Sequence, residues 1–266
     1  MEGFAPVEGG RLYYEVRGEG PSIVLIHAGL WDSRIWDDQM GAFAQRYRTV
    51  RYDLRGFGRS DRLTIPFSLR QDLTDLLAFL RIPSAALVAC SIGGSLAIDF
   101  TLERPDMVDA LVLVAPGLSG DDTPDDERTA RLMKEAEQAL ETGQLEKLVD
   151  LQLQAWTPPA NNPEVDRRIR EIAMDNKHVD TLDWSLSRRL DPPAAGRLSE
   201  IHVPTLVILG DRDAPVMEVI VEKVASGIHG ARKALIQDAD HLPNMRQPDR
   251  FNQEVLAFLA EALHRA

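Results

Sequence analysis

Short, continuous apolar runs bounded by turn residues recur toward both ends of the chain. They cover residues 22–26, 49–52, 85–90, 111–115 and 205–209, with a weaker run at 233–236. Runs of this length that lack alternation are typical of strands buried on both faces of a parallel sheet. An alternating, β-rich segment at 11–16 lies between glycine-containing turns and is typical of a hairpin strand. The pattern predicts a mostly parallel sheet.

Amphipathic helical periods lie between these runs. Leucines at 69, 73, 76, 77 and 80 recur at helical spacing and form one apolar stripe. Ser68 and Gln71 match a capping box at the start of this helix. A second stripe lies within residues 250–262. Strands that alternate with such helices predict right-handed crossovers, and therefore a doubly wound α/β sheet with helices on both faces.

One stretch interrupts the alternation. From residue 118 to residue 196 the sequence shows helical periods and proline-bearing joints but no strand-like run. We therefore expect a helical insertion at 118–196, placed between two strands of an α/β core formed by residues 1–117 and 197–266.

Composition narrows the possible partners. The 266 residues carry a net charge of −12, and 44% are hydrophobic, which is typical of a globular protein and not of a disordered one. The acidic balance argues against a nucleic-acid partner, and the chain has neither a polybasic cluster nor an apolar run long enough to span a membrane. With a single cysteine, Cys90, and no secretory signal, we expect a cytoplasmic protein without disulfides.

The most informative segment is Ala89-Cys90-Ser91-Ile92-Gly93-Gly94, where a buried strand runs through small residues into a helix. This is the setting of the G-x-S-x-G nucleophile elbow, in which a strained turn exposes a serine hydroxyl above the sheet. Ala89 replaces the first glycine of that motif. The alternative is a strand-to-helix turn that carries an ordinary solvated serine.

A nucleophilic serine needs a base and an orienting carboxylate, which in such folds follow it in the order acid, then histidine. Asp211 and Asp213 follow the run at 205–209, and His241 follows the last weak run. Both positions lie at the carboxyl ends of predicted strands, where sites in open α/β sheets form. We prefer Asp213 as the acid, with Asp211 as its rival.

Two backbone N–H groups are needed to stabilise an oxyanion. The N–H of Ile92 follows the proposed nucleophile, and the loop after the run at 22–26 offers Gly29 as a second donor. His27 in that loop is expected to be a buried, hydrogen-bonded residue that shapes it. Trp31, Trp156 and Trp184 either line an apolar substrate pocket or pack in the core.

Together the motifs IVLIHAG, YDLRGFGRS, ACSIGG, GDRD and DADHLPN resemble the α/β-hydrolase superfamily, and within it the small, capped, cofactor-free esterases and lactonases, such as enol-lactonases. The resemblance implies a Ser91–His241–Asp213 triad, an oxyanion hole at Gly29 and Ile92, and a helical cap at 118–196. Ala89 and Ala28 depart from the glycines usual at these positions. The loop containing Asp53 and Arg55 is expected to be structural.

The sequence thus predicts a serine hydrolase that cleaves a small carboxylic ester or lactone through an acyl-enzyme, without metal or other cofactor. The expected partner is a small molecule and neither nucleic acid nor membrane, and a homo-oligomer stays possible. Alternatives on the same triad are carbon–carbon bond hydrolysis and perhydrolysis, and a further alternative is a ligand receptor with negligible turnover. Dehalogenase and epoxide-hydrolase chemistry is disfavoured, because both use an aspartate where this chain has Ser91.

Overall fold

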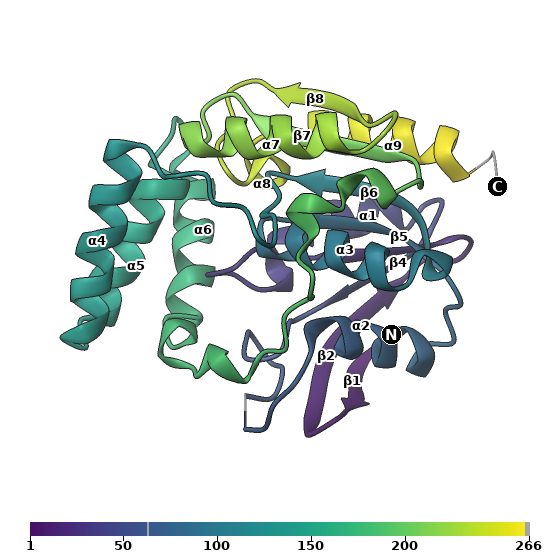
Figure 1. Cartoon of the computed structure of the whole chain (residues 1–266), viewed down its shortest axis with the longest axis horizontal. Coiled ribbons are helices and arrows are strands. Elements are labelled where there is room, and N and C mark those ends of the chain that lie inside the picture. The colour runs from purple at the N-terminus through teal and green to yellow at the C-terminus, as the bar shows by residue number, and fades with distance from the viewer. Residues whose placement is uncertain (63, 264–266) are drawn as a thin grey trace.

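The computed structural model describes residues 1–62 and 64–263. Within these residues the strands form one eight-stranded sheet in the order β1-β2-β4-β3-β5-β6-β7-β8 (Figure 1). Strands β1, β2 and β4 pair antiparallel, and every pair from β4 to β8 is parallel. The mostly parallel sheet expected from the apolar runs is confirmed.

The strands are β1 Glu2–Val7, β2 Gly10–Arg17, β3 Ser22–Ile26, β4 Arg48–Tyr52, β5 Ala85–Cys90, β6 Val108–Val114, β7 Thr205–Gly210 and β8 Arg232–Ile236. The α-helices are α1 Asp37–Phe43, α2 Leu69–Phe79, α3 Ile92–Glu103, α4 Glu127–Glu141, α5 Leu145–Trp156, α6 Pro163–Asp175, α7 Pro215–Gly227, α8 Pro243–Arg246 and α9 Pro248–Leu263. Short 3-10 helices lie at Ser33–Trp36, Pro105–Met107, Val179–Thr181, Trp184–Leu186, Ala194–Gly196 and Leu198–Glu200.

The continuous apolar runs are explained by burial of the sheet on both faces. Along β3, Val24 and Ile26 join a core with α2, α3 and α7, whereas Ile23 and Leu25 join a second core with α1 and α9. Because successive side chains of a strand point to opposite faces, a strand covered on both sides needs apolar residues at every position. Helices on both faces of the sheet are therefore confirmed.

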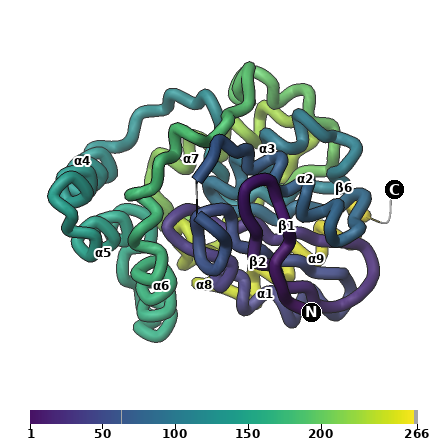
Figure 2. Tube along the Cα trace, turned by 90° about the horizontal axis from the view of Figure 1, so that it is seen from below, coloured from purple at the N-terminus to yellow at the C-terminus, as the bar shows by residue number. Residues whose placement is uncertain are grey.

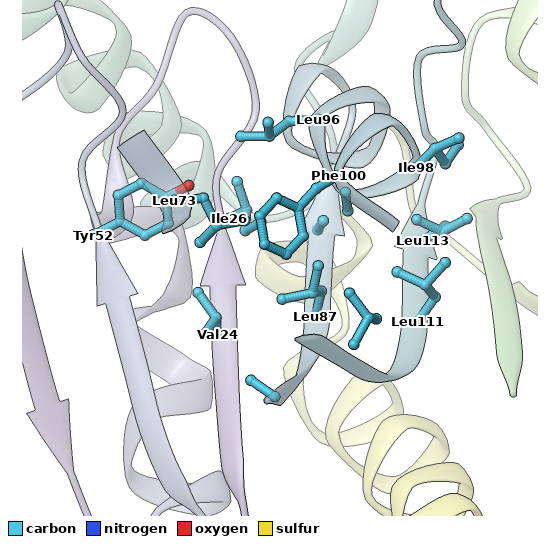
Figure 3. Close-up of a cluster of buried hydrophobic side chains, with 14 of the residues drawn as sticks. Val24, Ile26, Tyr52, Leu73, Leu87, Leu96, Ile98, Phe100, Leu111 and Leu113 are labelled. Carbon is cyan, nitrogen blue, oxygen red and sulfur yellow. The ribbon is translucent and has the colours of Figure 1, made fainter. Parts of the chain in front are cut away.

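Helix α3 supplies the centre of the first core. Figure 3 shows Phe100 reaching from this helix toward Ile26 of β3 and Leu87 of β5. All three side chains are fully buried. This packing fixes the helix over β3 and β5 and so fixes the strand-to-helix junction at residue 91.

The residues between β6 and β7 leave the sheet. They form α4, α5, α6 and several 3-10 helices, and Figures 1 and 2 both show these three α-helices standing beside the sheet, not over one of its faces. Helices α4 and α5 pack on each other through a small apolar cluster of their own. The segment returns to the core through Ala194–Gly196 and Leu198–Glu200.

The structure corrects three local expectations. Residues 2–7 form β1, which the sequence pattern did not predict, and β6 begins three residues before the apolar run, where Val108 pairs with Ala85. Only half of the capping box forms: Ser68 Oγ accepts the N–H of Gln71 at 3.4 Å, but the Gln71 side chain donates to Asp75 instead of returning to residue 68.

The strand order places the segments that follow β3 and β5 side by side. From β3 the chain runs to β4 on one side of β3 and then crosses to β5 on its other side. The chain continues from β5 to β6, away from β4, so the order of strands in the sheet reverses between β3 and β5. In open α/β sheets, ligands bind at the carboxyl ends of strands at such a reversal. Here those ends carry the loop after Ile26 and the turn after Cys90.

Candidate active site

Ser91 occupies the junction of β5 and α3 in a backbone conformation that is rare for a residue with a side chain. Its φ is 53° and its ψ is −114°. Such conformations cost about 1–3 kcal/mol and persist only where the surroundings enforce them. Here the Ser91 N–H donates to Val114 O at 3.0 Å, and Ser91 O accepts from Ser95 and Gly117.

The glycines after Ser91 allow this turn to form. A Cβ on Gly93 would lie 2.6 Å from His27 O, and one on Gly94 would lie 2.6 Å from the Pro116 side chain. Helix α3 therefore begins in close contact with the end of β3 on one side and with the loop after β6 on the other. The small residues that the sequence places here are required by this crossing. Ala89, which replaces the usual glycine, is fully buried in the core below.

Asp213 and His241 form a buried pair. The Nδ1 atom of His241 lies 3.0 and 3.1 Å from the two carboxylate oxygens of Asp213, and both side chains are at least 96% buried. A carboxylate only accepts hydrogen bonds, so Nδ1 carries the proton and Nε2 is left as the basic nitrogen. Asp211, the rival acid, instead accepts the N–H of Ala239 at 3.2 Å.

The electrostatic surroundings favour the protonated imidazole. Burial lowers the pKa of His241, but the charge and hydrogen bond of Asp213 outweigh it, with a further contribution from Asp240, so the pKa lies above its ordinary value. Asp240 does not reach the ring. Its carboxylate pairs with Arg246 at 2.7 Å and accepts the N–H of Leu242.

Sheet topology brings the serine and the histidine to one edge. Ser91 follows β5, Asp213 follows β7 and His241 follows β8, all at the carboxyl ends of parallel strands. Directly beside the serine, the Cys90 thiol lies 3.7 Å from His241 O. The Cys90 side chain is fully buried, and burial raises the pKa of its thiol, so it packs as a small apolar residue.

The two residues that carry the proposed oxyanion donors are neighbours in space. A Cβ built on Gly29 would be 3.6 Å from the Cγ2 atom of Ile92, which is the first residue of α3. In the part of the chain that the structure describes, neither backbone N–H donates a hydrogen bond. An N–H in the first turn of a helix has no partner within that helix. The pair is therefore available to an external acceptor.

His27 shapes this loop, as expected from the sequence. Its Nε2 accepts the N–H of Leu54 at 2.9 Å, and its Nδ1 then donates to Ala28 O at 2.7 Å. Burial lowers the pKa of His27, consistent with this neutral form. Asp53 and Arg55 are structural as predicted: the first accepts from Ser33 and Arg59, and the second pairs with Asp72.

The three tryptophans fall in different places. Trp184 lines a cavity beside Ile92. Trp156 lies at the end of α5 with its ring centroid 5.2 Å from that of His241, and its carbonyl accepts the N–H of His241 at 3.3 Å. Trp31 does not line the cavity: it is buried in the core, and its indole donates to Ile169 O at 3.1 Å.

The cavity that contains Trp184 has a volume of about 700 Å³. One wall is the face of α3 that includes Ile92, Ser95, Leu96 and Asp99. The opposite wall comes from residues 187–191 together with Trp184 and Pro193. The space therefore lies between helix α3 and the segment that follows α6.

Sequence reasoning missed the polar residues that join the helical segment to the loops around the site. Arg246, which is almost fully buried, pairs with Asp240 in the histidine loop and with Asp166 of α6. Asn176 donates to Asp32 and accepts from the N–H of Gly58. Asp166 lies 80 residues from Arg246, and Asn176 lies 144 residues from Asp32 and 118 from Gly58, so no local pattern marks these contacts.

Two kinds of feature are absent from the residues that the structure describes. No group of three or more His, Cys, Asp or Glu side chains there is arranged to hold a metal ion. No helix within the same residues is both long and apolar enough to cross a bilayer.

Comparison with known proteins gives the family. A family model described as "Alpha/beta hydrolase family" matches residues 23–254. Carboxylesterase YbfK of Bacillus subtilis is 25% identical over 258 residues, which cover 91% of this chain and 81% of the relative. The pimeloyl-[acyl-carrier protein] methyl ester esterase of Nitrosospira multiformis is 25% identical over 259 residues, covering 93% of this chain and 97% of the relative.

A solved structure shows the same likeness in three dimensions. The enol-lactonase from Burkholderia xenovorans LB400 aligns with a TM-score of 0.72 at 25% identity, covering 97% of this chain and 100% of that one. The match of the family model spans both the elbow and the histidine loop. The chain belongs to the alpha/beta hydrolase family.

Proposed function

We propose that the protein is a carboxylic ester hydrolase that cleaves a small ester or lactone through an acyl-enzyme formed on Ser91. The observation that carries this proposal is the buried Asp213–His241 pair at the sheet edge where Ser91 is held in its strained turn. A proton fixed on Nδ1 leaves Nε2 as the base that a serine hydroxyl requires.

In the first half of the reaction, Ser91 Oγ attacks the carbonyl carbon while His241 Nε2 takes the hydroxyl proton. Asp213 holds the ring and stabilises the imidazolium. The N–H groups of Gly29 and Ile92 stabilise the oxyanion of the tetrahedral intermediate. As that intermediate collapses, His241 gives its proton to the leaving alkoxide, and the acyl group stays on Ser91.

In the second half, water replaces the alcohol. His241 removes a proton from the water, whose oxygen attacks the acyl carbon, and the returning proton releases Ser91 and a carboxylic acid. In a lactone the alcohol and the acid belong to one molecule, so the product is a single hydroxy acid.

Residues 118–196 are proposed to act as a cap on this site. The support is contact at the histidine: Trp156 lies against the His241 ring, and Arg246 pairs with Asp166 across the same boundary. Covering the site would exclude water and strengthen the electrostatic interactions inside it.

The nucleophile is tested by Ser91→Ala. We expect hydrolysis of p-nitrophenyl acetate and butyrate to fall by about 10⁴-fold or more, because attack and proton transfer both depend on the hydroxyl. A fluorophosphonate should add its mass to the wild-type protein at residue 91 and leave the variant unmodified. The thermal melt should stay close to that of the wild type.

Ser226→Ala is the matched control, because it removes an exposed hydroxyl whose hydrogen bonds to the described residues lie within α7. It should keep wild-type turnover. Wild-type turnover in Ser91→Ala would reject the serine mechanism. Labelling of residue 91 without multiple turnover on any ester or lactone would instead indicate a ligand receptor.

A further inference from the structure

The cavity beside Ile92 runs along a single face of α3. Its residues Ile92, Ser95, Leu96 and Asp99 are spaced at i, i+3, i+4 and i+7, which is one stripe of a helix. At 1.5 Å per residue, Asp99 lies about 10 Å along the helix axis from Ile92, whose N–H is a proposed oxyanion donor. Ser91 does not itself line the cavity, but it directly precedes Ile92, so the cavity begins one residue beyond the proposed nucleophile.

Asp99 is the buried charge at the far end of this stripe. The residue is 8% exposed, and in the described part of the chain its carboxylate receives one side-chain hydrogen bond, from Ser119 Oγ at 2.6 Å. An ionised carboxylate offers about four acceptor positions. Burial raises the pKa of Asp99, against the opposing effects of the Ser119 hydrogen bond and the charge of Arg70.

Two nearby guanidinium groups, those of Arg70 and Arg197, are paired with other residues. Arg70 donates to Glu103 at 3.0 Å and to the carbonyl oxygens of Arg188 and Arg189 at 3.3 and 3.5 Å. Arg197 pairs with Glu200. Among the described lining residues, the buried carboxylate of Asp99 therefore has unused acceptor positions, whereas the buried guanidinium of Arg70 already donates to three other groups. The side chains of Arg188 and Arg189 are exposed and belong to the outer wall.

We propose that Asp99 is a specificity-determining residue that binds a hydrogen-bond donor, a hydroxyl or an ammonium group, on the acyl chain of the substrate. This inference rests on the proposed function, because it takes the acyl group to be held on Ser91. The preferred substrate is then an ester or lactone of an acid that carries such a donor about 10 Å from its carbonyl carbon. A buried acceptor of this kind discriminates strongly, since a substrate without the donor leaves it unpaired.

The test compares p-nitrophenyl esters of octanoic, 8-hydroxyoctanoic, 8-aminooctanoic and octanedioic acids. An extended chain of eight carbons reaches about 9 Å, at about 1.2 Å per backbone bond. For the wild type we expect kcat/KM to be about tenfold or more higher for the hydroxy and amino esters than for the octanoate. Each result is expressed as a ratio to the octanoate of the same protein, so a general loss of activity cancels.

Two substitutions at Asp99 separate charge from hydrogen bonding. Asp99→Asn keeps an oxygen that accepts from Ser119 and from a hydroxyl, so it should keep the hydroxy preference and lose the amino preference. Asp99→Leu should lose both preferences. Asp106→Asn, which removes an exposed charge outside the cavity, should leave both ratios as they are in the wild type. If the Leu variant does not fold, the loss of the amino preference in the Asn variant decides.

Equal ratios in the wild type and in both Asp99 variants would overturn the proposal. So would a wild-type preference for the octanedioate ester that disappears in Arg188→Gln or Arg189→Gln, since the cavity would then recognise a carboxylate. Both results require that octanoate is hydrolysed through Ser91. Absence of that hydrolysis, or its survival in Ser91→Ala, is failure of the proposed function, so the two failures are distinguishable.

Discussion

At the scale of single residues, the site depends on one imidazole whose two nitrogens are made unequal. Asp213 fixes the proton of His241 on Nδ1, and the same carboxylate raises the pKa of the ring against the effect of burial. A base of this kind is active only when neutral. The raised pKa of His241 stabilises the imidazolium, and it also sets the pH below which the reaction loses its base.

This gives a prediction for pH dependence. In the wild type, kcat/KM for p-nitrophenyl butyrate should rise with pH through a midpoint above about 6.5, the ordinary value for histidine. Asp213→Asn removes the charge that raises this pKa while burial still lowers it, so the midpoint should move to lower pH. Turnover should fall by about 10⁴-fold, because the amide no longer fixes the tautomer.

Asp211→Asn is the control for that pH profile, since Asp211 bonds the N–H of Ala239 and not the ring. Its acid midpoint should match that of the wild type. A profile that shifts in Asp211→Asn and not in Asp213→Asn would reassign the triad acid.

At the scale of secondary-structure elements, the decisive contact is the crossing of α3 over the end of β3. Backbone oxygens of residues 26 and 27 lie so close to Gly93 that any Cβ there would meet them at 2.6–2.7 Å. Phe100 and Leu96 anchor the same helix in the core, so it cannot move away freely. The turn at Ser91 is held in its strained form by this packing.

Gly93→Ala should therefore lower the free energy of unfolding by about 1–3 kcal/mol, because the new methyl group meets backbone and not a flexible side chain. Esterase activity should fall with it as the turn shifts. The free energy of unfolding is measured by urea denaturation.

Gly41→Ala is the matched control. A Cβ at this exposed position of α1 has no atom within 4 Å, so the substitution should stabilise by about 0.5–1 kcal/mol through the better helix propensity of alanine. Equal stability of the Gly93 and Gly41 variants would contradict the role of the close crossing.

At the scale of the whole molecule, residues 118–196 are joined to the core at the histidine loop. Arg246 lies between Asp240 of that loop and Asp166 of α6, and it also donates to Pro158 O. The Arg246 and Asp240 side chains are 3% and 5% exposed, so the two charges are desolvated together. Breaking such a pair by removing one partner leaves a buried charge without compensation.

Arg246→Met should lower the free energy of unfolding by about 3–5 kcal/mol at neutral pH. Burial already raises the pKa of Asp240 above its ordinary value, and loss of Arg246 should raise it further. A carboxyl group whose pKa is raised by folding destabilises the folded protein once the pH exceeds the pKa of that group in the unfolded chain. The loss of unfolding free energy in Arg246→Met, relative to the wild type, should therefore become smaller as the pH falls toward 4. Urea denaturation at pH 7 and pH 4.5 measures this.

Arg170→Met removes an exposed arginine that pairs with Asp150 within the helical segment. Such pairs contribute about 0–1 kcal/mol, and the change should not depend on pH in this window. A deficit in Arg246→Met no larger than this control would show that the buried pair does not join the two parts.

Much of the architecture could be predicted from the sequence because it depends on local patterns of apolar and small residues. A strand formed by an apolar run such as 22–26 must be buried on both faces. The small residues around Ser91 are informative because the close crossing of helix and strand excludes larger ones. Segment β1 escaped prediction because it is an edge strand, whose residues include the exposed Phe4 and only one fully buried side chain, Ala5. Its pairing with β2 supplies the regularity that its own pattern lacks.

The sequence by itself determined the alternation of strands and helices after β1, the serine turn and the histidine and acid loops, because each depends on neighbours close along the chain. Tertiary structure alone decided which aspartate meets the imidazole, since Asp211 and Asp213 differ only in where the loop after β7 directs them. It also decided that Trp31 packs in the core while Trp184 faces the cavity, and that Asp99 lies along that cavity. Distances between segments far apart in sequence depend on how strands pair and helices pack, and no local periodicity encodes them.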